Sequence, residues 1–193
     1  MADFFKSRYN KQSLWSLFLM CALPLHLWTF LMVFRDMSWV SERTNAWDAV
    51  GVASYGATFA LIESLIIFLL VAAVGLLTPG YWDYNRRISF LSLFILIVSL
   101  WAIIVQLLSL WNIWLPYGLV RFLVNTHHPV RYLYLLLLVV IVPTIFFPLY
   151  SFIRSKRSVA VMQDLIERFS TLTVFYLFFD LIGVCIVIIR NIS

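Results

Sequence analysis

Charged residues are scarce in this 193-residue chain, and their scarcity excludes a water-soluble fold. Asp, Glu, Lys and Arg together make up 12% of the residues, whereas 63% are hydrophobic. Soluble domains carry about 25% charged and roughly 45 to 50% apolar residues. So few charges cannot keep so many apolar side chains in water, and we therefore expect the chain to fold in a lipid bilayer.

Cysteines and catalytic motifs are also scarce. Cys21 and Cys185 lie in apolar runs without a CxxC pattern or a spaced histidine, so we interpret both as packing residues. The chain contains neither GxGD nor HExxH, and its lysines all lie outside the apolar runs. These absences argue against an intramembrane protease, a thiol oxidoreductase and a retinal protein. We predict no cofactor, and these absences favour a non-enzymatic protein without excluding every enzyme.

Five apolar runs are each long enough to cross a bilayer, for which a helix needs about 20 residues. They cover residues 13–34, 49–78, 88–113, 132–153 and 169–189. Because the runs are continuous and do not alternate with polar residues, they predict helices and exclude a closed barrel. We therefore predict an all-α integral membrane protein, a five-helix bundle that forms one transmembrane domain over residues 1–193.

The basic residues favour one orientation of this bundle. Nine of them flank the runs on the side of the N-terminus and five lie on the opposite side: Lys6, Arg8, Lys11, Arg86, Arg87, Arg154, Lys156, Arg157 and Arg168 against Arg35, Arg43, Arg121, Arg131 and Arg190. The positive-inside rule then predicts a cytoplasmic N-terminus and an outer C-terminus. We expect a multi-pass protein of a prokaryotic plasma membrane. No soluble segment combines a basic stripe with stacking aromatics, so the net charge of +5 does not indicate a nucleic-acid partner.

Two connecting segments have helical patterns of their own. Residues 158–168 place apolar side chains on one face and begin at a candidate N-cap, Ser158, which predicts an amphipathic inner segment before the last span. Residues 118–124 lie between Pro116 and Pro129 and predict a short interfacial helix.

Two formally charged side chains, Glu63 and Asp180, lie inside the apolar runs, each within about 3 Å of the centre of its run. His26 and Gln106 lie about 4 Å and about 8 Å from the centre toward the outer face. An isolated ion at this depth costs from about 2.5 to above 10 kcal/mol. We therefore predict that Glu63 and Asp180 share a proton or pair with His26, and that these four side chains form an ion or proton site.

Small residues recur at helical spacing and predict helix-packing faces. In the second run they follow each other at every fourth position, which lets a neighbouring backbone approach closely. Glu63 follows Ala60 by three residues, so we expect it to point at a helix and not at lipid. The predicted packing residues are Gly56, Ala60, Ser64, Ser92, Ser99 and Gly183.

The pair His127–His128 could join Asp48 or Glu42 in an outer metal site, because two imidazoles and a carboxylate can hold zinc. Without a third ligand at a fixed spacing, we interpret the two histidines as part of an exposed loop and predict no metal.

These patterns leave three functions open. The first is a non-enzymatic accessory or structural subunit that assembles with itself or with another membrane protein through its small-residue helix faces. The second is a small proton- or cation-coupled transporter or channel that uses the midplane carboxylates. An enzyme acting on a lipid at the membrane surface, with Arg121, His127 and His128 near a phosphate, is the third.

Overall fold

A computed structural model describes residues 8–110 and 115–192, which form six helices and contain no strand. The helices are α2 (Lys11–Arg43), α3 (Ala46–Leu76), α4 (Tyr84–Leu110), α5 (Tyr117–Val124), α6 (Pro129–Arg154) and α7 (Lys156–Ile192). All except α5 are long and apolar enough to cross a membrane. The prediction of an all-helical fold with five helices long and apolar enough to span a membrane is thereby confirmed for the described residues, although 111–113 of the third predicted span lie outside them.

Two of the long helices, α2 and α7, begin ahead of their apolar runs, and a polar side chain caps each of these starts. Asn10 caps α2, since its side-chain oxygen accepts a hydrogen bond from the Ser13 amide at 2.6 Å. Ser155 caps the start of α7, because its hydroxyl accepts a hydrogen bond from the Ser158 amide at 3.3 Å. The expected cap at Ser158 is therefore wrong by three residues, and the segment 158–168 continues without interruption into the last span.

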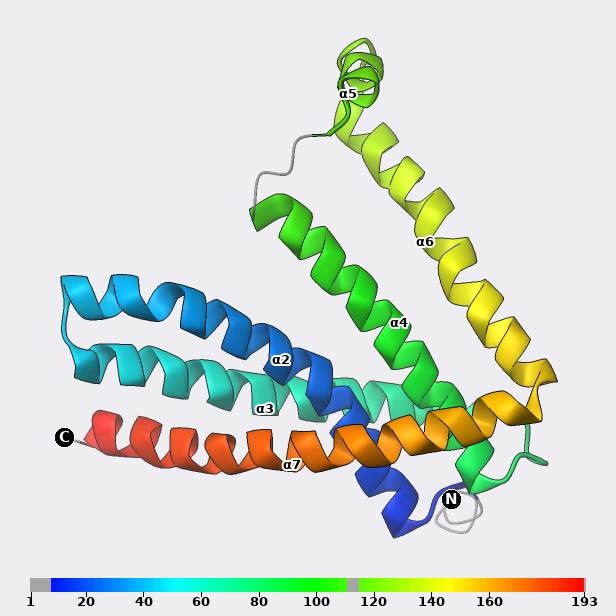
Figure 1. The fold of residues 1–193 in the computed structure, drawn as a ribbon, viewed down its shortest axis with the longest axis horizontal. Coiled ribbons are helices and arrows are strands. Elements are labelled where there is room, and N and C mark those ends of the chain that lie inside the picture. Colours follow the sequence, from blue (N-terminus) through cyan, green and yellow to red (C-terminus); the bar gives the residue numbers. More distant parts are fainter. Residues whose placement is uncertain (1–7, 111–114, 193) are drawn as a thin grey trace.

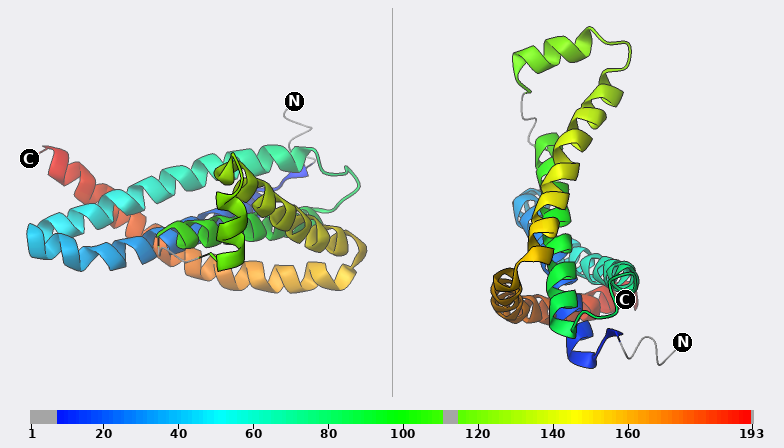
Figure 2. Two further views of the ribbon diagram at one scale, coloured as in Figure 1. Left: turned by 90° about the horizontal axis from the view of Figure 1, so that it is seen from above. Right: turned by 90° about the vertical axis from the view of Figure 1, so that its right-hand side faces the viewer.

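Three of the helices, α2, α3 and α7, pack side by side, while α4 and α6 lean away from them (Figure 1). All five meet at the end that contains residues 8–13, 77–88 and 152–158, which we call the basal end. Toward the opposite, distal end, an arm formed by α4, α5 and α6 separates from the other three helices (Figures 1 and 2). Of the 18 most apolar consecutive residues of α2, 44% are buried, whereas only 11% are buried in the corresponding segment of α6. The core therefore lies among α2, α3 and α7 and at the basal end.

A buried apolar cluster joins all five long helices near the basal end, and Val71 and Ala72 are its members from α3. It includes Leu17 and Met20 of α2, Leu91 of α4, Phe152 of α6 and Ile166 of α7. Because each helix contributes a side chain, the cluster fixes the base of the arm against the three-helix unit.

A fully buried arginine, Arg87, holds the connections at the basal end. Its Nε donates to the Thr78 hydroxyl at 2.9 Å, and its two terminal nitrogens donate to the carbonyls of Arg8 and of Trp82, the latter at 3.1 Å. These neutral acceptors stabilise a guanidinium that would otherwise be costly to bury. Arg87 thus links the N-terminal segment, the loop between α3 and α4, and α4 itself.

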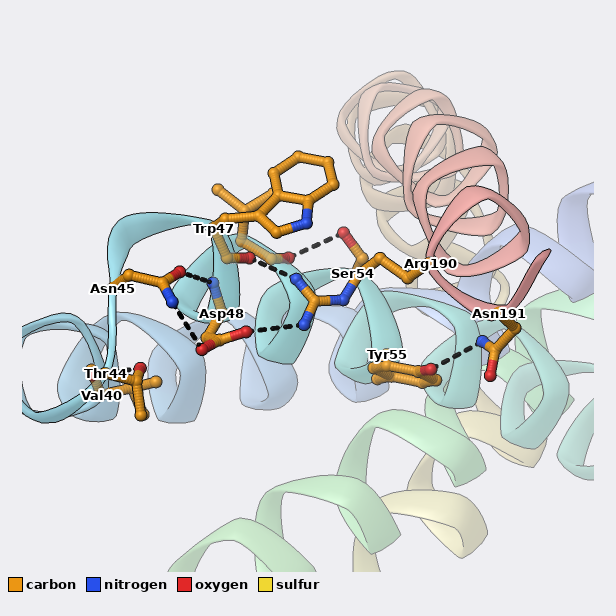
Figure 3. Close-up of polar contacts among 10 residues, drawn as sticks. Val40, Thr44, Asn45, Trp47, Asp48, Ser54, Tyr55, Arg190 and Asn191 are labelled. Carbon is orange, nitrogen blue, oxygen red and sulfur yellow. Dashed lines mark hydrogen bonds and ion pairs between the residues drawn. The ribbon is translucent and has the colours of Figure 1, made fainter. Parts of the chain in front are cut away.

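At the distal end, α7 is attached to the start of α3 by Arg190 (Figure 3). Its guanidinium donates to the Asp48 carboxylate and to the Trp47 carbonyl, both at 2.7 Å. Gly51 leaves room for this contact, because a Cβ there would lie 2.7 Å from the Arg190 Cζ. The three-helix unit is therefore held together at its distal end as well as at its base.

Candidate functional site

His26 of α2 and Asp180 of α7 form a buried polar pair inside the three-helix unit. Their side chains are 0% and 1% exposed. The Nε2 atom of His26 lies 2.7 Å from Oδ2 of Asp180, and Nδ1 lies 2.7 Å from the Ala22 carbonyl oxygen. Of the four side chains predicted to form an ion or proton site, the structure brings these two together.

The hydrogen bonds of His26 determine how many protons the pair holds. Because the Ala22 carbonyl can only accept, Nδ1 must carry a proton. One further proton then lies between Nε2 and the Asp180 carboxyl. With the proton on Nε2, the pair is an imidazolium and a carboxylate, and with the proton on Oδ2 it is a neutral imidazole and a carboxylic acid. Both forms have zero net charge, so the pair needs no further counter-ion.

Aromatic rings pack against the pair, while other buried polar side chains of α3 and α7 form hydrogen bonds within their own helices. The ring of Tyr176 stacks on His26, with a centroid distance of 6.1 Å and an interplanar angle of 5°. The buried hydroxyls of Ser64 and Thr173 donate to carbonyls of their own helices at 2.6 and 2.8 Å. The second Asp180 oxygen, Oδ1, has no hydrogen-bond partner among the described residues. The pair is therefore a tightly enclosed link between α2 and α7.

A close approach of α7 to α3 carries Asp180 into the interior. A Cβ on Gly183 would lie 3.1 Å from the Ser54 carbonyl oxygen and 3.3 Å from the Ala57 Cβ. Only glycine leaves this contact without a shift of the neighbouring helix. Since Asp180 precedes Gly183 by three residues, it lies on the same buried face of α7.

Glu63 does not join the pair. Its side chain is exposed, whereas Ala60 and Ser64 beside it are 1% and 0% exposed. The expectation that it points at a neighbouring helix is therefore wrong. At about 100° per residue, Glu63 lies about a quarter-turn from Ser64, on the flank of α3 that no other described helix covers.

Gln106 is also exposed, on the outward half of α4. Burial decreases along this helix, because the predicted packing residue Ser92 is fully buried, the predicted packing residue Ser99 is half-buried and Gln106 is exposed. The separation of α4 from the three-helix unit toward the distal end explains this gradient (Figure 1). The spacing of residues in the sequence did not predict that α4 separates from the three-helix unit.

The other predicted packing residues are used within this chain. Ala60, Ser64 and Gly183 are buried, and a Cβ on Gly56 would lie 3.2 Å from Val33 and 3.3 Å from Thr29 of α2. The small-residue faces therefore bring α2, α3 and α7 together and are not open to a partner.

The grooves on the described surface include two that are not lined by His26, Glu63 or Asp180. One, of about 770 Å³, lies at the basal end between α2, α4 and α7. The other, of about 650 Å³, lies at the turn between α5 and α6 and includes His127 and His128. Asp48 belongs to α3, away from this turn, and no group of three or more metal-binding side chains occurs among the described residues.

Five long apolar helices and a buried pair of zero net charge indicate a multi-pass helical membrane protein. Comparison of the chain with protein-family models, with curated proteins and with solved structures finds no match.

Proposed function

We propose that this protein is a non-enzymatic subunit of a membrane assembly and that Glu63 is its docking residue. The observation that carries the proposal is the exposure of this carboxyl group in the middle of an apolar helix that is long enough to span the membrane. Glu63 has no hydrogen bond or ion pair to another described residue. A residue in this position requires a partner from outside the chain.

The energetic argument is that lipid cannot solvate Glu63. A carboxylate at the bilayer centre costs from about 2.5 to above 10 kcal/mol, and even the protonated acid loses a hydrogen bond there. The neighbouring exposed residues are large and apolar: Phe59 is 62% exposed, Ile66 53% and Leu70 59%. Together with Glu63 they follow the spacing i, i+4, i+7 and i+11 of a helix-packing stripe. We call these four residues the Glu63 face.

The chemistry of this face specifies the partner. A transmembrane helix fits it when that helix presents a hydrogen-bond donor or a cation at the same depth and apolar side chains on either side of it. The partner is either a second copy of this chain or another membrane protein with such a helix. We further propose that the basal end lies in the cytoplasm of a prokaryotic plasma membrane, because the larger group of basic residues is found there.

The mass of the protein in mild detergent, measured by light scattering after extraction from its native membrane, tests the proposal. We expect a species heavier than the 22.6 kDa monomer. Glu63→Leu is expected to convert it to the monomer and to raise the thermal stability of that monomer. Glu42→Leu removes an exposed carboxylate near the distal end of α2 and is the matched control, which should leave the assembly intact. A monomer at every concentration, in wild type as in Glu63→Leu, would rule the proposal out.

A proton- or cation-coupled carrier is the competing proposal, favoured by the proton that His26 and Asp180 share. Such a carrier needs a path along which protons reach the buried pair, and the basal groove does not extend to it. Val174 lines the basal groove and lies six residues, or about 9 Å along the helix, before Asp180. Liposome flux that is abolished by Asp180→Asn and retained in Glu63→Leu would favour the carrier over the subunit.

A further inference from the structure

The basal groove has the dimensions and the lining of a ligand site. Its volume of about 770 Å³ lies within the roughly 300 to 1,000 Å³ of small-molecule pockets. It is formed by the starts of α2 and α4 and by the first half of α7, three segments that are far apart in the sequence. No function proposed above uses it.

Unsatisfied hydroxyl groups line this groove. Ser89 is fully buried, and its Oγ has no hydrogen-bond partner among the described residues. The Oγ of Ser170, across the groove on α7, is likewise buried and without a partner. Leaving such a group unpaired costs about 1 to 3 kcal/mol, so a ligand that forms hydrogen bonds with both hydroxyls would be stabilised at this site.

The remaining polar lining is rich in amides. Gln12, Asn85 and Gln163 line the groove, and Glu167 supplies one carboxylate. None of the described lining residues is Lys, Arg or His, which disfavours a phosphate or another anion. Amides and hydroxyls can both donate and accept, so they suit a neutral ligand with several hydroxyl groups.

Aromatic and aliphatic groups complete the site. Trp15 lines the groove and is 51% exposed, so its ring offers a flat apolar surface. Ile88 and Ile166 line the groove from α4 and α7. A sugar has this same mixed character, because its hydroxyl groups lie around the edge of the ring and its C–H groups on the faces.

We infer that the basal groove binds a hexose-sized polyhydroxyl group. Its hydroxyls form hydrogen bonds with Ser89, Ser170 and the amides, and its C–H face packs on Trp15. The chemistry is shared by a glycolipid headgroup and a free saccharide. This site is independent of the Glu63 face, so either proposal can fail without the other.

Binding is tested with the full chain in nanodiscs. Native mass spectrometry compares the binding of hexosyl-diacylglycerol with that of diacylglycerol, phosphatidylethanolamine and phosphatidylglycerol of the same acyl chains. Saturation-transfer NMR measures the binding of free methyl hexoside. At about fivefold in affinity for each hydrogen bond, two or more bonds give a preference of at least about 25-fold for the hexosyl lipid over diacylglycerol. Binding of the free hexoside with similar affinity also supports the site and identifies the source as soluble.

Substitutions then assign the binding to this groove. Asn85→Ala and Gln163→Ala are each expected to weaken hexosyl-lipid binding about fivefold. Asn125→Ala, in the loop between α5 and α6, removes an exposed amide outside the groove and should have no effect. Ser89→Ala gives the sharpest result, because it should raise the melting temperature of the free protein while it lowers the affinity for the ligand.

Three results would overturn the inference. They are equal binding of hexosyl-diacylglycerol and diacylglycerol, a preference for phosphatidylethanolamine, and hexosyl-lipid binding that is unchanged in both Ser89→Ala and Gln163→Ala.

Discussion

His26 and Asp180 are 154 residues apart in the chain, yet their side chains lie 2.7 Å apart between α2 and α7. The pair links α2 to α7 inside the three-helix unit, and it holds one proton between its two members. Two substitutions of Asp180 can therefore separate the loss of the hydrogen bond from the loss of the acid.

We expect Asp180→Asn to be tolerated better than Asp180→Leu. The asparagine amide can donate to Nε2 of a neutral His26, whereas leucine leaves that buried nitrogen unpaired at a cost of about 1 to 3 kcal/mol. A double-mutant cycle with His26→Leu should give a coupling energy of about 0.6 kcal/mol and at most about 1.7 kcal/mol, the mean and the maximum found for hydrogen bonds between membrane helices. Thermal unfolding in detergent measures both. Equal destabilisation by asparagine and leucine would contradict the hydrogen bond.

Gly75→Ala tests the packing of the basal end. A Cβ at Gly75 would collide with the Tyr9 hydroxyl and with Cδ1 of Leu91, so we expect a loss of about 1 to 3 kcal/mol from overpacking. Gly118→Ala is the matched control, because no atom lies within 4 Å of the added Cβ and alanine favours a helix by up to about 1 kcal/mol. Denaturation curves should move in opposite directions for the two variants.

Asp48→Asn tests the attachment of α7 to α3 at the distal end. Because the Asp48 and Arg190 side chains are 37% and 23% exposed, their ion pair contributes less than about 1 kcal/mol to global stability. We expect the change to be local, with faster amide hydrogen exchange in the last two turns of α7. Asp36→Asn breaks the ion pair with the adjacent Arg35 of the same helix and should leave exchange in α7 unchanged.

Tyr9 predicts a dependence of stability on alkaline pH. Burial raises the pKa of Tyr9 to about 12, although the cations of Arg87 and Arg8 oppose this rise, and its hydroxyl donates to the Ala72 carbonyl at 2.8 Å. A pKa raised on folding gives stability that is complete below pH 10 and is lost as the pH rises toward 12. The difference in unfolding free energy between wild type and Tyr9→Phe should therefore be constant up to pH 10 and shrink above it. A constant difference across this range would show that Tyr9 is not buried.

The contrast between Asp180 and Glu63 shows how far the candidate site could be predicted. Residue counting gives depth, because each residue of a helix advances by a fixed rise, and it placed both carboxyls near the middle of their spans. The direction in which each side chain points depends on the rotation of its helix against its neighbours. The small-residue stripe of α3 turned Ala60 and Ser64 inward and left Glu63 exposed on the adjacent flank.

The basal groove shows a second limit. Its polar residues come from α2, α4 and α7, and each of them taken alone looks like an ordinary residue at the end of a span. No spacing in the sequence connects Gln12, Asn85 and Gln163, because the distances between them depend on how three helices meet.

The sequence by itself determined that the chain has five spanning helices and where in each helix the polar side chains lie. The physical reason is that hydrocarbon supplies no hydrogen bonds, so each span must satisfy its own backbone locally. The tertiary structure alone decided which polar side chains meet, that α4, α5 and α6 form a separate arm, and that Glu63 has no partner among the described residues. Those outcomes depend on helix rotation and crossing, which are set by packing between residues far apart in the chain.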